Sequence, residues 1–354
     1  MIYRQDRQRQ EEILLCEVAT KSSESAGRKI FEEECPFRTC FQRDRDRIIH
    51  SKAFRRLMHK TQVFISPEKD HFRTRLTHTL EVTQVARSIA RMLALNEDLT
   101  EAIALGHDLG HTPFGHTGEA VLNEIYTGGF HHNEQSLRVV DLIETRNGRR
   151  GMNLTYEIRD GIVNHTGGRH ASTPEGQVVK ISDRIAYINH DIDDAMRSGA
   201  ILKDQLPSEP IRVFGKAHSE RISNMIEVVV ENSDGKHSVG MDEYHNNLLM
   251  QLRSFMFENV YGSPMVKKEE DIARVDLVIK SLYNYFLSNP DQLPDDMLDL
   301  AEEEQNNRIN DGQQSEMAFV PFDGDVSPIA TAAKDYIAGM TDRFALNLYG
   351  DLFC

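Results

Sequence analysis

Cysteine is scarce in this sequence, because the 354 residues contain only Cys16, Cys35, Cys40 and Cys354. Four cysteines are too few for a disulfide framework in a chain of this length, and this is typical of a reducing cytoplasm. Cys35 and Cys40 lie five positions apart, but no second pair of cysteines or histidines completes a zinc site around them. We therefore expect free thiols and a cytoplasmic location.

Long apolar runs and an excess of positive charge are also absent. No stretch approaches eighteen consecutive apolar residues, which excludes a membrane-spanning helix. The first twelve residues, MIYRQDRQRQEE, have no apolar core, so we expect no cleaved signal peptide. The net charge of −15 argues against nonspecific binding of nucleic acid. The hydrophobic fraction of 39% is nevertheless too high for a disordered chain.

Positive charge is concentrated in one window of this acidic chain. Residues 36–91 contain thirteen lysines and arginines against five acidic residues, which leaves a surplus of eight positive charges. A local positive field of this kind indicates a polyanionic ligand held in one place. A solvated helix face whose basic residues pair with acids elsewhere would give the same pattern. Charge alone does not separate the two interpretations.

The spacing of apolar residues predicts an all-α protein. Leu76, Leu80, Val85, Ile89 and Met92 recur at three-to-five-residue intervals, as on one face of a helix. The same criteria predict helices over 76–95, 98–109, 116–126, 174–196, 243–261, 270–288 and 328–346. The one strand candidate is IEVVV at 226–230, and the acidic stretch 291–316 is expected to be a loop or a solvated helix. No repeat of 20–50 residues indicates a solenoid.

Local signals mark the ends of three of these helices. Asp98 and Glu101 form a capping-box-like start to the 98–109 helix, in which each end can satisfy the other's free amide. Pro174 suits the first position of the 174–196 helix. The Asp193-Asp194 pair that follows Asp191 is expected to be a solvated helix end.

Histidine is concentrated between positions 71 and 132. Seven of the fifteen histidines fall there, far more than an even spread would give: His71, His78, His107, His111, His116, His131 and His132. His78 is in line with Val82 and Val85 on the face of its helix that we expect to be buried. A single histidine on such a face is more often a core residue than a ligand, and an adjacent His-Asp pair is common by chance.

Taken together, His78, the His107-Asp108 pair and Asp183 resemble the H…HD…D signature of the HD-domain metal phosphohydrolases. Two imidazoles and two carboxylates give a mixed nitrogen and oxygen donor set that suits a borderline or hard divalent ion. The carboxylates also neutralise the dication, and open positions remain for water and a phosphate oxygen. The resemblance implies one divalent metal ion per site, namely Mn²⁺, Mg²⁺ or another transition metal such as iron, nickel or zinc.

A longer run is similar to one branch of that superfamily, the dGTP triphosphohydrolase-like dNTPases. The run is GHDLGHTPFGHTGE at 106–119, and the likeness extends over about residues 36–195, with a weaker echo at 335–345. Further matches are DRDRIIHSKAFRRLMHKTQVF at 44–64, RTRLTHTLEV at 73–82, HHNEQSLR at 131–138, LTYEIRDGIVNHTG at 154–167 and SDRIAYINHD at 182–191. The resemblance implies an HD-domain helical bundle over 1–354, with a catalytic core at about 36–205 and a helical C-terminal part at about 206–354.

The family hydrolyses a deoxynucleoside triphosphate to the deoxynucleoside and inorganic triphosphate, which the resemblance implies for this chain too. Proton transfer would fall to His116 and Glu119, which are spaced i, i+3 on one helix face. A carboxylate bonded to one ring nitrogen fixes the imidazole tautomer and raises its pKa. Taken alone, such a pair would more often be a surface salt bridge. His132 matches a further active-site histidine of the family.

The resemblance also implies a set of substrate contacts. Arg75, His111 and Arg184 match phosphate contacts of the family. Asp183, Tyr187 and Asp191 are spaced i, i+4, i+8, so they share a helix face that leads from the metal to the sugar. The expected 3′-hydroxyl partners are Asp191 and Gln62, with Tyr187 beside the sugar and phosphates. A core tyrosine and a helix-face acid are the plainer interpretations of Tyr187 and Asp191.

Several points stay open in the sequence. Base specificity, for dGTP or for several dNTPs, depends on residues in 210–290, where the likeness is weak. The family also suggests an allosteric nucleotide, a homo-oligomer (a hexamer or tetramer) and weak binding of single-stranded DNA, without a membrane partner. A nucleotidase or phosphodiesterase acting on another phosphoester is the second hypothesis, and a degenerate nucleotide sensor or nucleic-acid binder is the third. His50, His59, His165, His170 and His190 receive no role.

Overall fold

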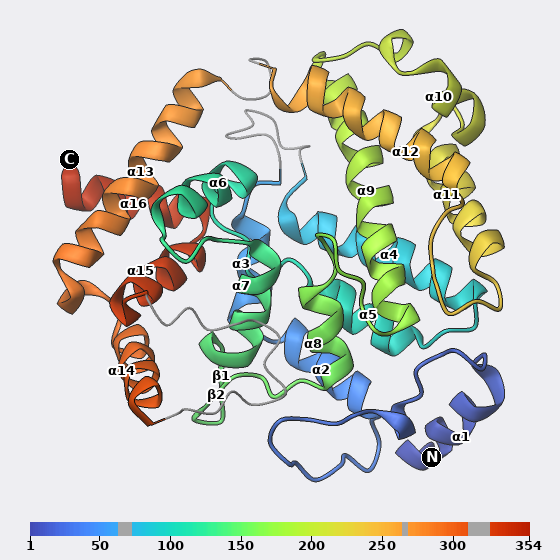
Figure 1. Ribbon diagram of the computed structural model, residues 1–354, viewed down its shortest axis with the longest axis horizontal. Helices are drawn as coiled ribbons and strands as arrows, with labels where there is room; N and C mark the ends of the chain where they lie inside the picture. The colour runs from blue at the N-terminus through green and yellow to red at the C-terminus, as the bar shows by residue number, and fades with distance from the viewer. Residues whose placement is uncertain (63–72, 264–267, 311–325) are drawn as a thin grey trace.

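The computed structural model of the protein describes residues 1–62, 73–263, 268–310 and 326–354, whose regular secondary structure is almost entirely helical (Figure 1). The helices are α1 (Arg4–Leu14), α2 (Cys40–Ile49), α3 (Lys52–Arg56), α4 (Arg75–Met92), α5 (Glu97–Gly106), α6 (Gly115–Ile125), α7 (His132–Arg138), α8 (Tyr156–Val163), α9 (Pro174–Ser198), α10 (Ser208–Phe214), α11 (His218–Ser233), α12 (Glu243–Met256), α13 (Glu269–Ser288), α14 (Asp295–Asn310), α15 (Pro328–Ala338) and α16 (Asp342–Phe353). A hairpin of β1 (Thr145–Arg146) and β2 (Arg149–Arg150) is the only sheet in these ranges. The predicted all-α fold is confirmed.

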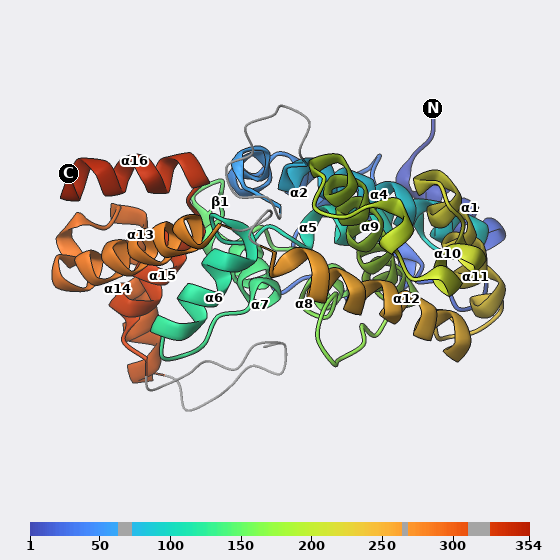
Figure 2. The same cartoon turned by 90° about the horizontal axis from the view of Figure 1, so that it is seen from above.

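The helices form two lobes around two hydrophobic clusters (Figures 1 and 2). The first cluster lies between α4, α5 and α9, where Val85, Ile103 and Ile185 are fully buried. The second joins α6, α13, α15 and α16, with Leu122 and Ile279 at its centre. Figure 2 shows α13 to α16 at one end of the molecule and α9 to α12 at the other.

The chain passes from one lobe to the other more than once. α6 follows α5 directly in sequence, yet it packs against α13 in the second lobe. α11 and α12 come much later, but both pack against α9 in the first lobe. The segment between α5 and α6, residues 107–114, therefore connects the two lobes, and it carries His107, Asp108 and His111.

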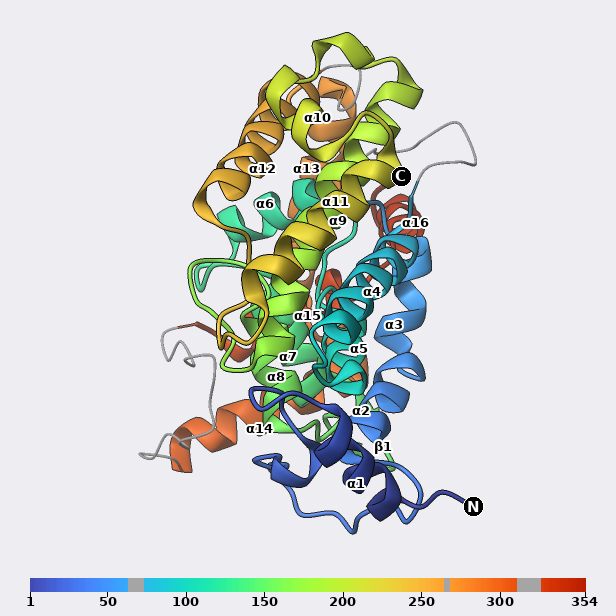
Figure 3. The same ribbon diagram turned by 90° about the vertical axis from the view of Figure 1, so that its right-hand side faces the viewer.

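The long helix α9 has the ends that its sequence predicts. The Thr173 side chain accepts a hydrogen bond from the Gly176 amide at 3.1 Å, Pro174 is the first helical residue, and Gly199 ends the helix in the left-handed conformation at φ 80°. α9 lies beside α4 in the middle of the first lobe (Figure 3). This places Asp183 opposite His78.

Two predicted features of helices were wrong. α5 begins at Glu97, because the Asn96 side chain caps it by accepting from the Leu99 amide at 3.2 Å. The expected capping residues Asp98 and Glu101 instead accept hydrogen bonds from Arg45 at 2.7 and 3.0 Å. The 328–346 helix is in fact α15 and α16. The break falls before Thr341, whose side chain caps α16.

The predicted strand over 226–230 was also wrong, since these residues lie inside α11. Met225 and Val229 are one helical turn apart and both fully buried, so packing against the first lobe overrides the β propensity of the valines. The hairpin of β1 and β2 turns at Asn147-Gly148, where both φ values are positive, at 52° and 74°. An Asn-Gly turn is a typical hairpin signal.

The remaining expectations have mixed outcomes. All four cysteines lie in the described parts of the chain and are free. Asp194 is buried and accepts from Arg73 at 2.6 Å, so it is not a solvated helix end. α14 covers 295–310 of the acidic stretch, and the rest of that stretch beyond 310 lies outside the described residues, as do Glu68, Lys69, Asp70 and His71.

Within the ranges that the structure describes, every helix is either too short or too polar to cross a membrane.

Candidate active site

A cavity of about 360 Å³ opens between α4, α9, α12 and the segment before α6. Ten of the thirteen predicted site residues line it: Gln62, Arg75, His78, Asp108, His111, His116, His132, Asp183, Tyr187 and Asp191. His107 and Glu119 lie immediately behind this lining, in contact with Asp108 and His132 respectively. Arg184 is half-buried and is not among the described residues that line the cavity, so its role as a phosphate contact stays a prediction.

His78, His107, Asp108 and Asp183, which we call the metal quartet, come together at the inner end of the cavity. The Asp183 Oδ1 atom lies 3.1 Å from His78 Nε2 and 3.9 Å from His107 Nε2. Asp108 Oδ1 lies 3.5 Å from His107 Nε2. α4 supplies the first histidine, the two residues directly after α5 supply the His-Asp pair, and α9 supplies Asp183.

The His107 ring is prepared to bind a metal ion. Its Nδ1 atom lies 2.6 Å from the Ala104 carbonyl oxygen, and a carbonyl only accepts, so the proton is on Nδ1. The lone pair is therefore on Nε2, which is buried and has no hydrogen-bond partner among the residues that the structure describes. Fixing a ligand's tautomer in this way is typical of metal-binding histidines. The donor set and the unsatisfied nitrogen both fit a divalent metal.

The charges in the quartet favour ionised carboxylates. Burial alone would raise the pKa of Asp183, but the hydrogen bond to His78 and the nearby His107 hold that pKa below its ordinary value. Burial likewise opposes ionisation of Asp108, while His107 and Arg75 lower its pKa well below the usual range. Arg75 donates from Nη1 to Asp108 Oδ2 at 2.7 Å. Two carboxylates thus stay negative beside the metal position.

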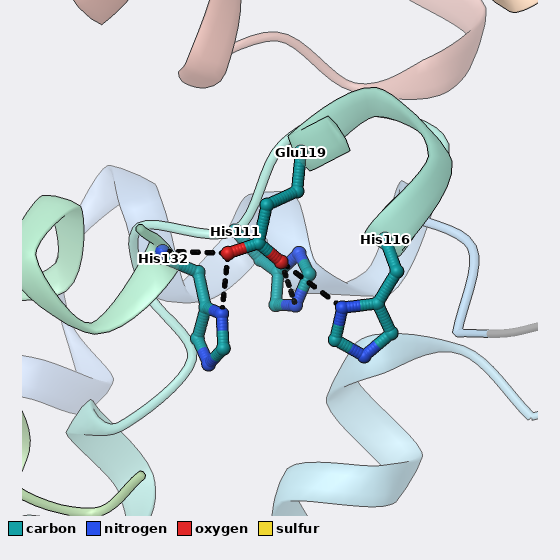
Figure 4. A group of neighbouring side chains, drawn as sticks. All are labelled: His111, His116, Glu119 and His132. Atoms are coloured by element: carbon teal, nitrogen blue, oxygen red, sulfur yellow. Dashed lines mark hydrogen bonds and ion pairs between the residues drawn. The ribbon is translucent and has the colours of Figure 1, made fainter. Parts of the chain in front are cut away.

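A second group, His111, His116, Glu119 and His132, lies next to the quartet, and we call it the Glu119 cluster (Figure 4). The Glu119 carboxylate lies in its centre, 3.0 Å from His116 Nδ1 through Oε2 and 2.8 Å from His132 Nδ1 through Oε1. His111 Nε2 lies 3.9 Å from Oε2, and the His111 ring stacks on His132 with centroids 4.5 Å apart. The predicted contact between His116 and Glu119 is confirmed.

Burial controls protonation in this cluster. It lowers the pKa of His111 well below the ordinary value, with Arg75 adding to the effect. The His116 side chain is 59% exposed, but the cavity walls around its ring still desolvate it and lower its pKa, which the hydrogen bond to Glu119 only partly offsets. For His132 burial acts in the same direction, but the hydrogen bond and charge of Glu119 outweigh it and raise the pKa. Among the three imidazoles of the cluster, His132 is therefore the one whose pKa is raised.

His165 is a contact that the sequence did not reveal. Its Nδ1 atom donates to the Ile162 carbonyl oxygen at 2.7 Å, which leaves the lone pair on Nε2. His132 Nε2 lies 3.2 Å from that nitrogen and must donate to it. Burial lowers the pKa of His165 to about 3, so it stays neutral. His165 follows directly on α8 in the 154–167 match, which could have marked it as a site residue.

The lining of the cavity includes three further residues that the sequence did not reveal. Arg253, Phe257 and Tyr261 line it from α12 and the π-helical turn that continues α12 over Phe257–Tyr261. Their i, i+4, i+8 spacing is the same as that of Asp183, Tyr187 and Asp191 on α9, so it indicates a shared helix face but not that this face lines the cavity. Arg253 Nε donates to the Tyr187 hydroxyl at 3.2 Å, and the Tyr261 hydroxyl donates to Asp191 at 2.5 Å.

Three polar groups that line the cavity have unsatisfied hydrogen-bonding atoms. Gln62 Oε1, Arg75 Nη2 and both ring nitrogens of His111 are buried and lack a partner within the described parts of the chain. Buried polar atoms are normally hydrogen-bonded, so each one indicates a missing ligand or water. An arginine nitrogen and an amide oxygen at the same cavity suit a ligand with both anionic and hydroxyl groups.

The basic window near the site is largely neutralised by acidic partners. Ion pairs join Arg38 to Asp46, Arg43 and Arg47 to Glu32, Arg45 to Asp98 and Glu101, Arg73 to Glu81 and Asp194, and Arg91 to Glu97. The second interpretation of the window, paired helix faces, therefore accounts for most of it. Arg75 is the arginine of this window that lines the cavity.

The second lobe holds the segment that connects α5 to α6. The Asp342 carboxylate, at the start of α16, accepts from the Phe114 amide at 2.9 Å and from the Thr61 amide at 3.0 Å. Phe114 has φ 61°, a left-handed conformation that costs a non-glycine residue about 1–2 kcal/mol. Lys60 donates to the carbonyl oxygens of His111 and Ala338. These contacts fix the backbone that carries His111 and His116.

Comparison with known proteins identifies the family of this chain. The HD domain family matches residues 75–188, and the family described as a phosphohydrolase-associated domain matches residues 239–312. A deoxyguanosinetriphosphate triphosphohydrolase-like protein of Caldanaerobacter subterraneus subsp. tengcongensis is 54% identical over 96% of this chain and 92% of its own length. Proteins of the same description from Desulfatibacillum aliphaticivorans and Clostridium perfringens are 45% and 44% identical, over 100% and 97% of this chain and 98% and 95% of their own lengths. The chain belongs to the deoxyguanosinetriphosphate triphosphohydrolase-like family of HD-domain proteins.

Proposed function

We propose that the protein is a metal-dependent deoxynucleoside triphosphate triphosphohydrolase, which converts a dNTP and water to the deoxynucleoside and inorganic triphosphate. The observation that carries the proposal is one cavity that holds the metal quartet, the Glu119 cluster and the Tyr187–Asp191 face side by side. Family membership supports a phosphohydrolase, and these neighbouring groups supply the separate parts that this cleavage requires.

The quartet would hold one divalent ion, Mn²⁺ or Mg²⁺, which when bound polarises a phosphate oxygen as a Lewis acid. Arg75 supplies a fixed positive charge at the same end of the cavity, because Asp108 holds its Nη1 atom while Nη2 stays unsatisfied. Arg253 provides a second guanidinium on the opposite wall. Two such forks suit the oxygens of a triphosphate.

His116 is the group placed to protonate the leaving 5′-oxygen. Its Nδ1 atom is held by Glu119 at 3.0 Å, and Figure 4 shows its Nε2 atom on the side of the ring away from Glu119. A bound triphosphate brings negative charge, which raises the pKa that burial has lowered and so favours the acid form. His132 shares the same carboxylate and orients it. A general acid of this kind contributes ~10²–10⁴-fold to the rate.

The sugar would bind at the outer half of the cavity. Asp191 and Gln62 both line it, and Gln62 Oε1 has no partner in the described residues. Tyr187 lies between Asp183 and Asp191 on the same face of α9. It would therefore lie beside the junction of the sugar and the phosphates of a bound substrate. A site that bonds the 3′-hydroxyl discriminates against analogues without it, because its buried polar groups are then left unpaired.

An end-product assay tests the proposal. The purified protein is incubated with each of the four dNTPs and with GTP, with Mg²⁺ and separately with Mn²⁺, and the products are separated by ion-exchange chromatography. We expect deoxynucleoside and intact triphosphate, and the same run gives the base specificity. Diphosphate, monophosphate or orthophosphate would instead support the second hypothesis, an enzyme for another phosphoester. Tight binding without turnover, in any metal and any mixture of dNTPs, would support a nucleotide sensor.

A further inference from the structure

The Glu119 cluster has the composition and spacing of a metal site in its own right. Each of its four side chains offers one ligand atom, and these atoms all lie within 4.8 Å of one another. Glu119 Oε2 lies 3.0 Å from His116 Nδ1 and 3.9 Å from His111 Nε2. Ligands in a tetrahedral zinc site, with bonds of about 2.0–2.1 Å, are roughly 3.3 Å apart. The observed separations lie on either side of that value.

The surrounding residues orient the ligand atoms toward a common centre. His132 donates from Nε2 to His165, whose own tautomer is fixed by Ile162, so the Nδ1 atom of His132 faces the cluster. The backbone amide of His132 holds Glu119 Oε1 at 2.9 Å, so an ion would bind Oε2 and replace its hydrogen bond to His116 Nδ1. Hydrogen bonds of this kind, one step behind the ligands, are typical of built metal sites.

His111 provides a second, independent indication of a missing ligand. It is 0% exposed, and neither of its ring nitrogens has a hydrogen-bond partner in the part of the chain that the structure describes. Figure 4 shows the ring directed at the Glu119 carboxylate from behind. A buried imidazole with two unsatisfied nitrogens is unfavourable, and binding a cation through Nε2 would satisfy one of them.

We propose that the Glu119 cluster is a second metal site, selective for Zn²⁺, beside the metal quartet. The quartet has two carboxylates and two imidazoles and suits Mn²⁺ or Mg²⁺, whereas three imidazoles and one carboxylate favour Zn²⁺. A Zn²⁺ ion would occupy the Nδ1 atoms of His132 and His116, which both face Glu119. It would thereby inhibit proton transfer to the leaving group. This inhibition rests on the proposed function, whereas the binding itself does not.

Metal counting tests the site without any turnover. The protein is freed of metal with a chelator, and Zn²⁺ binding is measured by calorimetry and by elemental analysis of the dialysed complex. We expect two Zn²⁺ ions per wild-type chain, one in Asp183→Ala, one in Glu119→Gln and none in the double variant. The matched control is Glu124→Gln on the same helix, α6, which should retain two ions. Mn²⁺ should fill one site only in the wild type.

Further outcomes decide the proposal in either direction. One Zn²⁺ per wild-type chain, or two in Glu119→Gln, would overturn it. His111→Gln is the second variant, since it removes a ligand on the other side of the cluster, and it should also bind one ion. In Asp183→Ala, Co²⁺ should give the intense visible absorption of four-coordinate cobalt. Zn²⁺ should inhibit the Mn²⁺-loaded enzyme. If the protein hydrolyses no dNTP at all, the proposed function fails, but the number of bound Zn²⁺ ions still decides whether the second site exists.

Discussion

The metal quartet and the Glu119 cluster lie side by side, but they are built in different ways. His78 and Asp183 of the quartet lie on α4 and α9 in the first lobe, and His107 and Asp108 directly follow α5, at the start of the segment that connects the lobes. The cluster comes from a connecting segment and from the first turns of α6 and α7, which border the second lobe. Its His116 side chain is 59% exposed, whereas that of His78 is 3% exposed.

This difference separates two tasks of one active site. A metal ion requires ligands at fixed separations, which buried helices in one core provide. A group that transfers a proton must instead reach the substrate and exchange with water, and the exposed imidazole of His116 in the first turn of α6 can do both. The two halves can therefore be disabled separately, and the predictions below use that separation.

Removal of a quartet ligand should have the largest effect. Asp183→Ala deletes the carboxylate closest to His78 and leaves a donor set too poor for a stable divalent site. We expect Mn²⁺ binding and dNTP hydrolysis both to disappear, a loss larger than the ~10²–10⁴-fold of a single general acid. Asp193→Ala on the same helix is the control. Full Mn²⁺ affinity in Asp183→Ala, measured by calorimetry, would contradict the assignment.

Removal of His116, the exposed member of the Glu119 cluster, should leave metal binding unchanged. His116→Ala leaves all four quartet ligands in place, so Mn²⁺ and a non-hydrolysable dNTP analogue should bind as in the wild type. We expect kcat to fall by ~10²–10⁴-fold because the leaving oxygen loses its acid. Calorimetry and single-turnover hydrolysis measure the two effects. If His116→Ala lost the metal, the division between the two groups would be wrong.

Asp191, on α9 in the first lobe, tests whether a buried carboxylate at the proposed sugar site lowers the stability of the folded protein. Burial raises the pKa of Asp191 to about 7, with Tyr261 acting in the opposite direction. The folded state therefore binds a proton that the unfolded state releases near pH 4, and stability should fall as the pH rises through this window. Between pH 5 and pH 8 the loss is on the order of 3 kcal/mol in the metal-free and substrate-free protein.

Asp191→Asn cannot ionise, so its free energy of unfolding should fall less than that of the wild type between pH 5 and pH 8. Urea unfolding at both pH values measures the difference, in which the other titrating groups cancel. Asp193→Asn, where the carboxylate is partly exposed on the same helix, should behave like the wild type. Equal pH dependence in all three proteins would show that Asp191 is not held protonated by burial.

Site residues that belong to sequence motifs could be predicted, whereas those placed only by the packing of distant helices could not. The metal quartet and the pair of His116 and Glu119 could be identified because their spacing is local or matches a known signature. Arg253 and Tyr261 could not, because nothing within 243–261 shows that α12 packs against α9 at the cavity. His165 was quoted within a motif, but its bond to His132 depends on how α7 packs against α8.

The fold shows the same limit. Helix positions followed from periodicity and capping residues, as at Pro174 and Thr173. The β-branched run in α11 was misassigned because its burial on the first lobe is a tertiary effect. The grouping of α6 with α13 joins segments about 150 residues apart, which local patterns do not encode. In the sequence, Asp342 belongs only to the weak family match at 335–345, although in the structure it contacts the active-site segment directly.

Asp342 should have the smallest effect. It tests whether contacts from the second lobe support the Glu119 cluster and not the metal quartet. Asp342→Ala removes the acceptor of the Phe114 amide, so the left-handed Phe114 is no longer held against its ~1–2 kcal/mol of strain. The segment before α6 should then leave the productive position for part of the time. We expect kcat to fall about tenfold, which corresponds to about 1.4 kcal/mol, while Mn²⁺ binding stays unchanged.

Hydrogen exchange measured by mass spectrometry provides a readout that does not need turnover. Amides of residues 110–118 should exchange faster in Asp342→Ala, while those of α4 and α9 should not change. Asp351→Ala, an exposed carboxylate on the same helix, is the matched control and should leave both regions as in the wild type. If Mn²⁺ affinity fell as much as kcat did, the second lobe would support the quartet as well as the cluster. The metal quartet and the Glu119 cluster would then depend on the same contacts in the protein, and would differ only in what they do to the substrate.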